Sequence, residues 1–393
     1  MKFQISDKRQ KQFTVIFILT HWISIYMYMY LLSTYAESMG ASRSVIGMVT
    51  GSYGLAMMVF RIPIGILSDT IKKQKIFFYF GNGMTFLAAL CYYLARTPEF
   101  LIVCTVMVGL GVSSWAIYMS SYCSFSPNAK VAMAIGELNV MMGVGQTVGT
   151  FSGGWLMQYA GQRSIFVVAM ISALVGILFV IPMRETYVAG GEPKKLKDFV
   201  DIVTKDRKLL FYSLLTAAIN FINVSAINAF VPVIIRGLGG TSVHVSTGST
   251  LCVLAGIFAA PLSCGILKEK LGIRKTAILG FLVMCIPMFL FCRMKSIVLI
   301  LALEAVNGFG RSMMYPLFNA CATSHLSPQQ RSTGNSTFQA IYSIGNFIGP
   351  TCVGFLSDAV DSLEISFIVL GCMCLALVAY IARTKRIVED VNP

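Results

Sequence analysis

The chain has 393 residues, of which 56% are apolar and only 12% are charged, and its mean hydropathy is +0.74. Soluble domains usually carry about a quarter charged residues, so this composition excludes a soluble globular protein. The net charge of +14 would suit a nucleic-acid-binding protein, but the basic residues are distributed as in a membrane protein.

Long apolar stretches alternate with short polar breaks along the whole chain. Each stretch reaches the roughly 20 residues that a helix needs to cross a bilayer. We therefore predict an all-α integral membrane protein with twelve spans, six in each half. Their expected starts lie near Phe13, Val45, Ile76, Phe100, Val131, Ile165, Leu209, Val243, Thr276, Ile297, Ser332 and Ile365.

The basic residues gather in every second polar break, which is the pattern of the positive-inside rule. It predicts a multi-pass protein of the cytoplasmic (inner) membrane with both termini in the cytoplasm. The same basic face suits contact with anionic lipid. The opposite side keeps only Arg43, Arg96, Arg163, Arg236, Arg293 and Lys295. The cytoplasmic set is Lys2, Lys8, Arg9, Lys11, Lys72, Lys73, Lys75, Lys130, Arg184, Lys194, Lys195, Lys197, Lys205, Arg207, Lys208, Lys268, Lys270, Arg274, Lys275, Arg331, Arg383, Lys385 and Arg386.

The first apolar stretch has full spanning length and lacks a small-residue cleavage site, so we expect a first helix and not a signal peptide. The eleven cysteines lie mostly in apolar stretches, without the spacing of zinc or haem sites. They predict reduced packing residues and no metal or cofactor. The spans contain no zinc-protease motif, serine nucleophile elbow or paired aspartates, which disfavours a membrane-embedded enzyme.

A polar segment separates the two halves. Its apolar residues recur at helical spacing between charges, at Leu196, Phe199, Val200 and Val203. We predict a six-helix bundle over residues 1–183, a cytoplasmic linker with an amphipathic surface helix over 184–208, and a second six-helix bundle over 209–393. A plain tether is the alternative for the linker.

The two halves repeat each other at an offset of about two hundred residues. The match covers four separate stretches, so the chain contains two copies of one unit. In a membrane protein of this kind, a site is expected near the bilayer midplane where the copies meet. The matched pairs include Pro63 with Pro261, Gly65 with Gly265, Asp69 with Glu269, Gly109 with Gly308, Gly111 with Gly310, Pro127 with Pro328, Gly145 with Gly345, Gly149 with Gly349, and Gly154 with Gly354.

The loop after the second span carries the most specific pattern. A glycine is followed four residues later by an acidic residue and then by a basic cluster, and the same pattern returns in the second half. Its members are Gly65, Asp69 and Lys73 in the first copy and Gly265, Glu269 and Arg274 in the second.

This chain resembles the major facilitator superfamily in these loops and over essentially its whole length. Lys72 stands where the family usually has a second glycine, and the second copy keeps that residue as Gly272. The resemblance implies the major facilitator fold, with twelve helices in two six-helix pseudo-repeats that move around a central cavity.

The first of these loops has the chemistry of a latch. Gly65 lets a neighbouring helix approach, and Asp69 can accept hydrogen bonds from the first amides of a facing helix. Asp69 can also bind the basic residues that follow it, or Arg61 earlier on its own helix. We expect this network to hold the cytoplasmic side closed when the site faces outward. The alternative is charge that only sets topology.

The fifth span carries Gly145, Gly149, Gly153 and Gly154. This resembles the glycine-rich signature of drug and proton antiporters of the superfamily, except that Thr150 replaces the usual proline. Small residues at this spacing let helices pack closely and slide, and a proline adds a kink. A tight but static interface is the alternative. The eleventh span echoes the pattern with Gly345, Gly349 and Pro350.

Ionisable residues at membrane depth are costly and therefore mark candidate functional positions. The fourth span lacks the arginine that the family places before its paired glycines. Glu304 and Arg311 flank the equivalent glycines of the tenth span, two turns apart on one face. Glu304, Glu137 and His21 are our candidates for proton coupling. A static structural pair is the alternative for Glu304 and Arg311.

Polar and aromatic residues of the central spans predict the lining of the cavity. Aromatic rings with amides and one cation suit an amphipathic or weakly anionic solute, and the many methionines and phenylalanines allow an adaptable apolar wall. The predicted lining is Trp22, Tyr26, Tyr30, Trp115, Tyr118, Asn220, Asn223, Asn228, Arg311, Tyr315, Asn319, Gln339 and Tyr342.

We therefore expect a monomeric secondary transporter that works by alternating access in the lipid bilayer. Its partners would be a small-molecule substrate and a proton, with no nucleic acid. Proton-coupled export of drug-like or amphipathic compounds is the first hypothesis. The alternatives are uptake or exchange of an organic anion around Arg311, or a facilitator without proton coupling.

Overall fold

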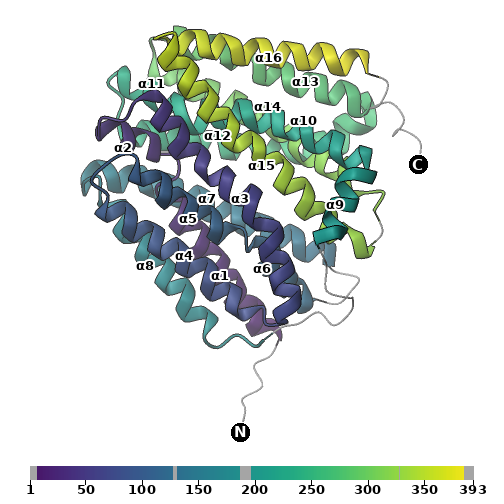
Figure 1. The fold of residues 1–393 in the computed structure, drawn as a ribbon. Helices are drawn as coiled ribbons and strands as arrows, with labels where there is room; N and C mark the ends of the chain where they lie inside the picture. The colour runs from purple at the N-terminus through teal and green to yellow at the C-terminus, as the bar shows by residue number, and fades with distance from the viewer. Residues whose placement is uncertain (1–6, 127–130, 186–195, 327, 385–393) are drawn as a thin grey trace.

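The computed structural model describes residues 7–126, 131–185, 196–326 and 328–384, and nearly all of these residues are helical (Figure 1). Several residues of the predicted patterns lie outside this part, namely Lys2, Pro127, Lys130, Lys194, Lys195, Lys385 and Arg386.

The twelve-helix prediction is confirmed. The spans are α1 (Asp7–Tyr26) with α2 (Leu32–Ser38), α3 (Arg43–Ile71), α4 (Lys75–Leu94), α5 (Phe100–Val112) with α6 (Trp115–Ser124), α7 (Val131–Tyr159), α8 (Ser164–Val180), α10 (Arg207–Asn223) with α11 (Val231–Gly237), α12 (Ser242–Leu262), α13 (Lys268–Leu290), α14 (Ile297–Thr323), α15 (Pro328–Ala359) and α16 (Leu363–Arg383).

Side-chain caps fix where three of these helices begin. The Ser42 hydroxyl accepts a hydrogen bond from the Val45 amide at the start of α3. The Ser362 hydroxyl accepts one from the Ile365 amide at the start of α16. The Asp206 carboxylate accepts one from the Leu209 amide, 2.9 Å away, at the start of α10. Serine and aspartate are favoured at such positions because they satisfy amides that have no partner inside the helix.

The two patterned loops both place a residue of positive φ at the equivalent position, but in different backbone conformations. Lys72 ends α3 in the left-handed α region with φ of 58° and ψ of 23°, whereas Gly272 has φ of 77° and ψ of 167°. The first conformation favours glycine because a Cβ atom is crowded there, and the second is adopted readily by glycine alone. Lys72 therefore ends α3 at a cost in backbone strain, and the two loops differ in shape at this point.

Equivalent glycines pack equivalent helices together inside each half. A Cβ atom on Gly109 of α5 would lie 2.7 Å from the Tyr53 carbonyl oxygen of α3, and one on Gly308 of α14 would collide with the Cys252 carbonyl of α12. The predicted glycines of α7, namely Gly145, Gly149 and Gly153, lie against the α1 backbone from Leu19 to Met27. Their counterparts Gly345 and Gly349 of α15 lie against Ala217 and Phe221 of α10.

The halves meet through α3 with α15 and through α7 with α12. Gly47, Gly51 and Gly54 of α3 lie against the α15 backbone, which includes the carbonyl of Pro350. We call the end of the molecule where α3, α12 and α16 begin the Arg43 end, and the opposite end the Lys73 end.

The close backbone contacts between the halves lie toward the Arg43 end. Gly154 of α7 packs on Ser242 and Ser246 of α12, and Gly354 of α15 packs on Arg43 and Ser44 of α3. Because Gly154 and Gly354 are repeat equivalents, as are Arg43 and Ser242, these two contacts are related by the internal symmetry.

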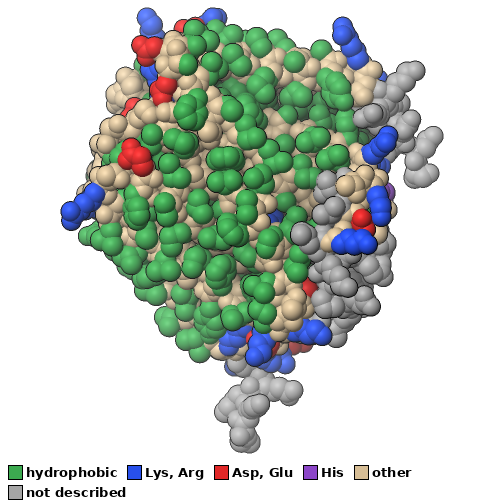
Figure 2. All heavy atoms as spheres, in the orientation of Figure 1, with side chains coloured by type: hydrophobic (Ala, Val, Ile, Leu, Met, Phe, Trp, Pro, Cys, Tyr) green, Lys and Arg blue, Asp and Glu red, His purple; other side chains and the backbone are tan. Residues whose placement is uncertain are grey.

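Hydrophobic side chains cover the middle of the face shown in Figure 2, and most charged side chains lie at its margins. By length and composition alone, seven helices or runs of joined helices in the described chain are apolar enough to cross a membrane. One of these runs, Ser242–Arg293, contains two of the predicted spans. The helices α1, α7 and α15 are not among them, nor is α8, which is apolar but shorter.

The segment between the halves contains α9 (Leu196–Lys205). The Phe199 side chain is buried, and α9 contacts α3, α10 and α15. The helix therefore touches both halves at the Lys73 end. The boundaries 1–183, 184–208 and 209–393 stay a prediction.

Candidate functional site

A row of aromatic rings runs along α1 and the turn that follows it. Ring centroids lie 5.8 Å apart between Trp22 and Tyr26 and 5.7 Å apart between Tyr26 and Tyr30. Spacing of four residues puts these side chains on one face. Trp115, at the start of α6, packs edge-on against Trp22 with centroids 5.4 Å apart.

A second aromatic group lies across the interface on α14 and α15. The rings of Tyr315 and Tyr342 pack edge-on with centroids 5.7 Å apart. The Arg311 guanidinium lies 5.8 Å from the Tyr315 ring centroid, which is within cation–π range.

The two groups meet between the halves. Tyr26 interacts electrostatically with Arg311 and Tyr342, and Tyr30 interacts with Arg311 and Glu304. We call the set Tyr26, Tyr30, Tyr53, Arg61, Glu304, Arg311, Tyr315 and Tyr342 the central cluster.

Three members of the central cluster were not predicted as lining residues: Glu304 was a candidate for proton coupling, Arg61 was assigned to the latch, and Tyr53 was not predicted at all. Tyr53 of α3 interacts electrostatically with Tyr26, Tyr342 and Arg61. Tyr53 and Arg61 are eight residues apart, so they lie close to one helix face. That spacing is the signal that could have placed both of them in the cavity.

Glu304 is the most isolated charged group of the described chain. Its side chain is 0% exposed, and neither carboxylate oxygen has a hydrogen-bond partner among the described residues. The carboxyl group faces α12, because a Cβ atom on Gly248 would lie 2.7 Å from it. No ion pair joins Glu304 to Arg311 within the described chain, so the two do not form the static pair considered above.

The other two proton-coupling candidates have different surroundings. His21 is buried, and its Nδ1 lies 2.6 Å from Asn82 Oδ1. Because the Asn82 amide nitrogen donates to the Ala173 carbonyl, Asn82 Oδ1 is an acceptor and His21 Nδ1 carries the hydrogen. Glu137 is exposed, less than two turns from the start of α7, and accepts a hydrogen bond from the Tyr122 hydroxyl at 2.8 Å.

Six further predicted lining residues are buried or half-buried in the described helices. Tyr118 is fully buried inside the first half and donates to the Phe77 carbonyl. Asn319 donates to Asn335 at 3.4 Å, and Gln339 is half-buried. Asn220 and Asn223 are buried in α10, and Asn228 is half-buried in the π-helical turn that follows it.

The patterned loops lie at the Lys73 end. A Cβ atom on Gly65 or Gly265 would meet nothing within 4 Å, so no helix packs on either glycine in this conformation. Asp69 is half-buried, and Arg61 donates to the Val112 carbonyl of α5.

The other residues predicted in the two patterned loops are Lys73, Glu269 and Arg274. Lys73 and Glu269 are exposed, and the Arg274 guanidinium donates to the Ile381 carbonyl within the second half.

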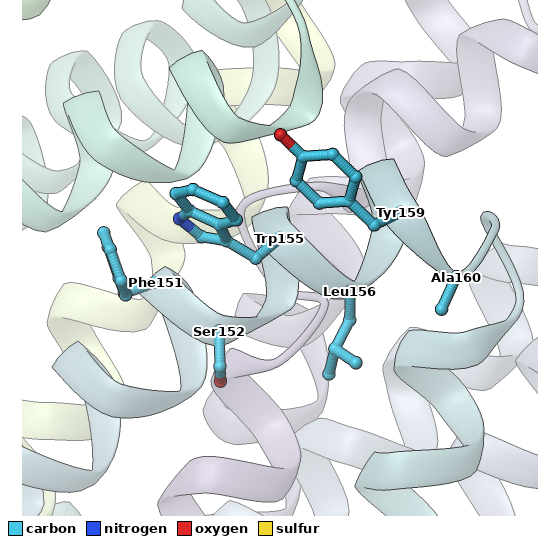
Figure 3. Close-up of a pocket in the computed structure, with 6 residues that line it drawn as sticks. All are labelled: Phe151, Ser152, Trp155, Leu156, Tyr159 and Ala160. Carbon is cyan, nitrogen blue, oxygen red and sulfur yellow. The ribbon is translucent and has the colours of Figure 1, made fainter.

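An apolar groove lies elsewhere, on α7. It is lined by Phe151, Ser152, Trp155, Leu156, Tyr159 and Ala160 (Figure 3). Trp155 and Tyr159 are 44% and 74% exposed. Interfacial aromatic side chains of this kind are typical of helices that face lipid, and no charged residue lines the groove. We therefore take the central cluster as the candidate site.

Comparison with known proteins agrees with the resemblance to the major facilitator superfamily. The family model described as Major Facilitator Superfamily matches residues 14–218 and 213–392. An uncharacterized MFS-type transporter of Methanocaldococcus jannaschii is 24% identical over 84% of this chain and 86% of its own length.

Two further proteins are informative. The proton-coupled antiporter flippase LtaA of Staphylococcus epidermidis is 22% identical over 86% of this chain and 89% of its own. The crystal structure of the nucleoside transporter NupG superposes with a TM-score of 0.79 at 13% identity, covering 96% of this chain and 100% of that chain. At this identity the structural likeness shows the fold.

Proposed function

The chain belongs to the Major Facilitator Superfamily of transporters, and we propose that it couples proton entry to the export of small amphipathic or drug-like organic compounds. The observation that carries the proposal is Glu304, a fully buried and unpartnered carboxyl group within the central cluster between the two halves.

Charge distribution supports an orientation. The basic residues concentrate at the Lys73 end, so this end is cytoplasmic and both termini lie inside. Since the halves touch closely toward the Arg43 end, the described conformation is closed to the outside. Alternating access then requires α3 to separate from α15, and α7 from α12, toward the Arg43 end.

Burial gives Glu304 the property that proton coupling needs. A carboxylate without a hydrogen-bond partner is strongly disfavoured in an apolar environment, whereas the protonated acid is tolerated. Opening toward the outside would hydrate Glu304 and let it exchange its proton. The named activity of the staphylococcal relative, proton-coupled antiport, is consistent with this scheme.

The aromatic rings of the central cluster suit the apolar part of an amphipathic solute. Tyrosine and tryptophan present flat apolar faces with a polar tip. A second candidate function is exchange or uptake of an organic anion, which the guanidinium of Arg311 favours, since its Nε is buried without a hydrogen-bond partner among the described residues.

Proton flux in inside-out vesicles with an acidified lumen tests the coupling. A pH-sensitive dye reports proton release when cationic, neutral and anionic compounds are added in turn. We expect compound-dependent proton release that falls at least about a hundredfold in Glu304→Gln, because the amide cannot carry the proton. Glu99→Gln, at an exposed position of the Arg43 end, is the matched control and should behave as wild type. Full proton release in Glu304→Gln would place the coupling elsewhere.

A further inference from the structure

A small cavity lies between the two halves at the Arg43 end, where α2 and α11 end. We call it the outer pocket. The helices α2 and α11 contact each other and lie next to each other in Figure 1. Because each half supplies one wall of the pocket, a molecule bound there would touch both halves. The pocket has a volume of about 300 Å³, and its walls are Thr34, Glu37 and Ser38 of α2 and Arg236 and Gly237 of α11.

The two walls have the same backbone geometry and opposite charge. Gly40 has φ of 84°, and its amide donates to the Glu37 carbonyl at 2.9 Å. Gly239 has φ of 80°, and its amide donates to the Arg236 carbonyl at 2.9 Å. A glycine of positive φ that follows a helix commonly ends it in this way. The shared turn makes Glu37 and Arg236 repeat equivalents, so one pocket receives a carboxylate from the first half and a guanidinium from the second.

The two charges do not neutralise each other by direct contact. Glu37 is half-buried and Arg236 is exposed, and they interact electrostatically. The ion pairs found in the described part of the chain join other side chains, for example Arg43 with Asp361. The Arg236 guanidinium makes a long hydrogen bond of 3.5 Å to the Gly240 carbonyl, just beyond its own helix. Both charged groups therefore keep hydrogen-bonding capacity for a molecule in the pocket.

The wall formed by α2 offers hydrogen-bond acceptors in addition to the carboxylate. The Thr34 hydroxyl donates to the Leu31 carbonyl at 2.8 Å, and the Ser38 hydroxyl donates to the Tyr35 carbonyl at 2.7 Å. A hydroxyl that has given its hydrogen to a carbonyl keeps lone pairs that accept. One carboxylate with two hydroxyl oxygens matches the three N–H donors of a primary ammonium group. The opposite wall presents a guanidinium, which binds carboxylate or phosphate oxygens.

We propose that the outer pocket binds a zwitterion, with a primary ammonium group on Glu37 and an oxyanion group on Arg236. The site is separate from the central cluster and does not depend on proton coupling. A ligand that joins α2 to α11 favours the conformation in which these helices are close, so it would hold the Arg43 end closed. The same chemistry is offered by a small solute and by the headgroup of an ethanolamine phospholipid, which lies at the depth where spans end.

Binding of radiolabelled O-phosphoethanolamine to the full chain tests the proposal. The purified protein is placed in nanodiscs of phosphatidylcholine, and scintillation proximity reports the bound probe. Three unlabelled competitors each lack one feature of the zwitterion. Methyl phosphate has no cation, ethanolamine has no anion, and phosphocholine carries a quaternary ammonium group without N–H donors. Competition curves give the dissociation constant of each compound.

We expect the wild type to bind phosphoethanolamine at least about tenfold more tightly than each competitor, the effect of one charged hydrogen bond. Glu37→Gln should weaken its binding about tenfold and remove the preference over methyl phosphate. Arg236→Gln should weaken it by a similar factor and remove the preference over ethanolamine. Arg96→Gln, which removes another exposed arginine of the Arg43 end, is the matched control and should bind as wild type.

Nanodiscs that contain phosphatidylethanolamine distinguish the two sources of the ligand. A weaker apparent affinity for the probe in these nanodiscs would show that the lipid headgroup occupies the pocket, and an unchanged affinity would assign the pocket to a small solute. Equal affinity for phosphoethanolamine and phosphocholine in the wild type, or unchanged preferences in both variants, would overturn the proposal. If a variant does not reach the membrane, the comparison of the four compounds in the wild type decides the question. The flux test of Glu304 is independent of this result.

Discussion

The two copies of the repeat differ most at one buried position, Thr105 in the first half and Glu304 in the second. Both side chains are 0% exposed. Thr105 is fully satisfied, since it shares a hydrogen bond of 2.6 Å with the Tyr92 hydroxyl and donates to the Leu101 carbonyl at 2.8 Å. Glu304 has no partner among the described residues. The same place in the fold is hydrogen-bonded in one copy and, in the proposed function, carries the proton in the other.

The same contrast appears two turns further along these helices. Val112 ends α5, and its repeat equivalent on α14 is Arg311. The Val112 carbonyl accepts a hydrogen bond from Arg61, whose own equivalent in the second half is Ala259. The repeat thus preserves helix packing, whereas the charged groups of the central cluster lie at positions where the copies differ.

Substitution of the paired glycines Gly109 and Gly308 would disrupt the helix packing that the two halves share. We expect this change to have the largest effect on stability. Gly109→Ala and Gly308→Ala should each lower stability by about 1–3 kcal/mol, because each new methyl group meets a backbone carbonyl of the neighbouring helix. Thermal unfolding of the purified protein, followed by tryptophan fluorescence, measures the loss. Gly83→Ala is the control, since a Cβ atom there meets nothing within 4 Å. Tolerance of one substitution but not the other would show that the two halves do not share this packing.

The helices and their internal packing could be predicted from sequence, whereas contacts between the halves could not. The span expected near Val45 begins at Arg43, and the one expected near Ile365 begins at Leu363, because hydropathy and capping residues are local signals. Tyr53 and Arg61 were missed as cluster residues because sequence does not give the rotation of α3 about its axis.

The proton-coupling role of Glu137 stays a prediction: its side chain is exposed less than two turns from the start of α7. The Asp358 carboxylate accepts hydrogen bonds from amides at the start of α3, more than three hundred positions away in the chain. No local sequence pattern could indicate this contact.

The contact of Asp358 with α3 extends the comparison of the two copies to the Arg43 end, where the second copy again carries a charge that the first lacks. The Asp358 carboxylate accepts hydrogen bonds from the Ser44 amide at 2.8 Å and the Arg43 amide at 3.2 Å, and thereby caps α3 across the interface. Its repeat equivalent, Gln158, is exposed.

Asp358→Ala should raise the population open at the Arg43 end about tenfold, because it removes charged hydrogen bonds to helix amides. Pulsed electron paramagnetic resonance can follow the distance between labels at positions 96 and 295, in a variant without the native cysteines. Gln158→Ala should leave the distance distribution unchanged. An equal shift in both variants would mean that the capping carboxylate does not hold this end closed.

The smallest expected effect tests the backbone at the end of the first patterned loop, where the two copies differ. Lys72 and Gly272 both have positive φ, but Lys72 is in the left-handed α region with ψ of 23°, whereas Gly272 has ψ of 167°. A side chain in the left-handed α region costs about 1 kcal/mol relative to glycine. Lys72→Gly should therefore be more stable than Lys72→Ala by about 1 kcal/mol, since both variants lose the same lysine side chain and differ only in backbone strain. Gly272→Ala should lose more, about 1–3 kcal/mol relative to wild type, because its conformation is open to glycine almost alone. Unfolding temperatures of the three variants measure these differences. Equal stability of Lys72→Gly and Lys72→Ala would mean that the first loop relaxes out of the left-handed conformation.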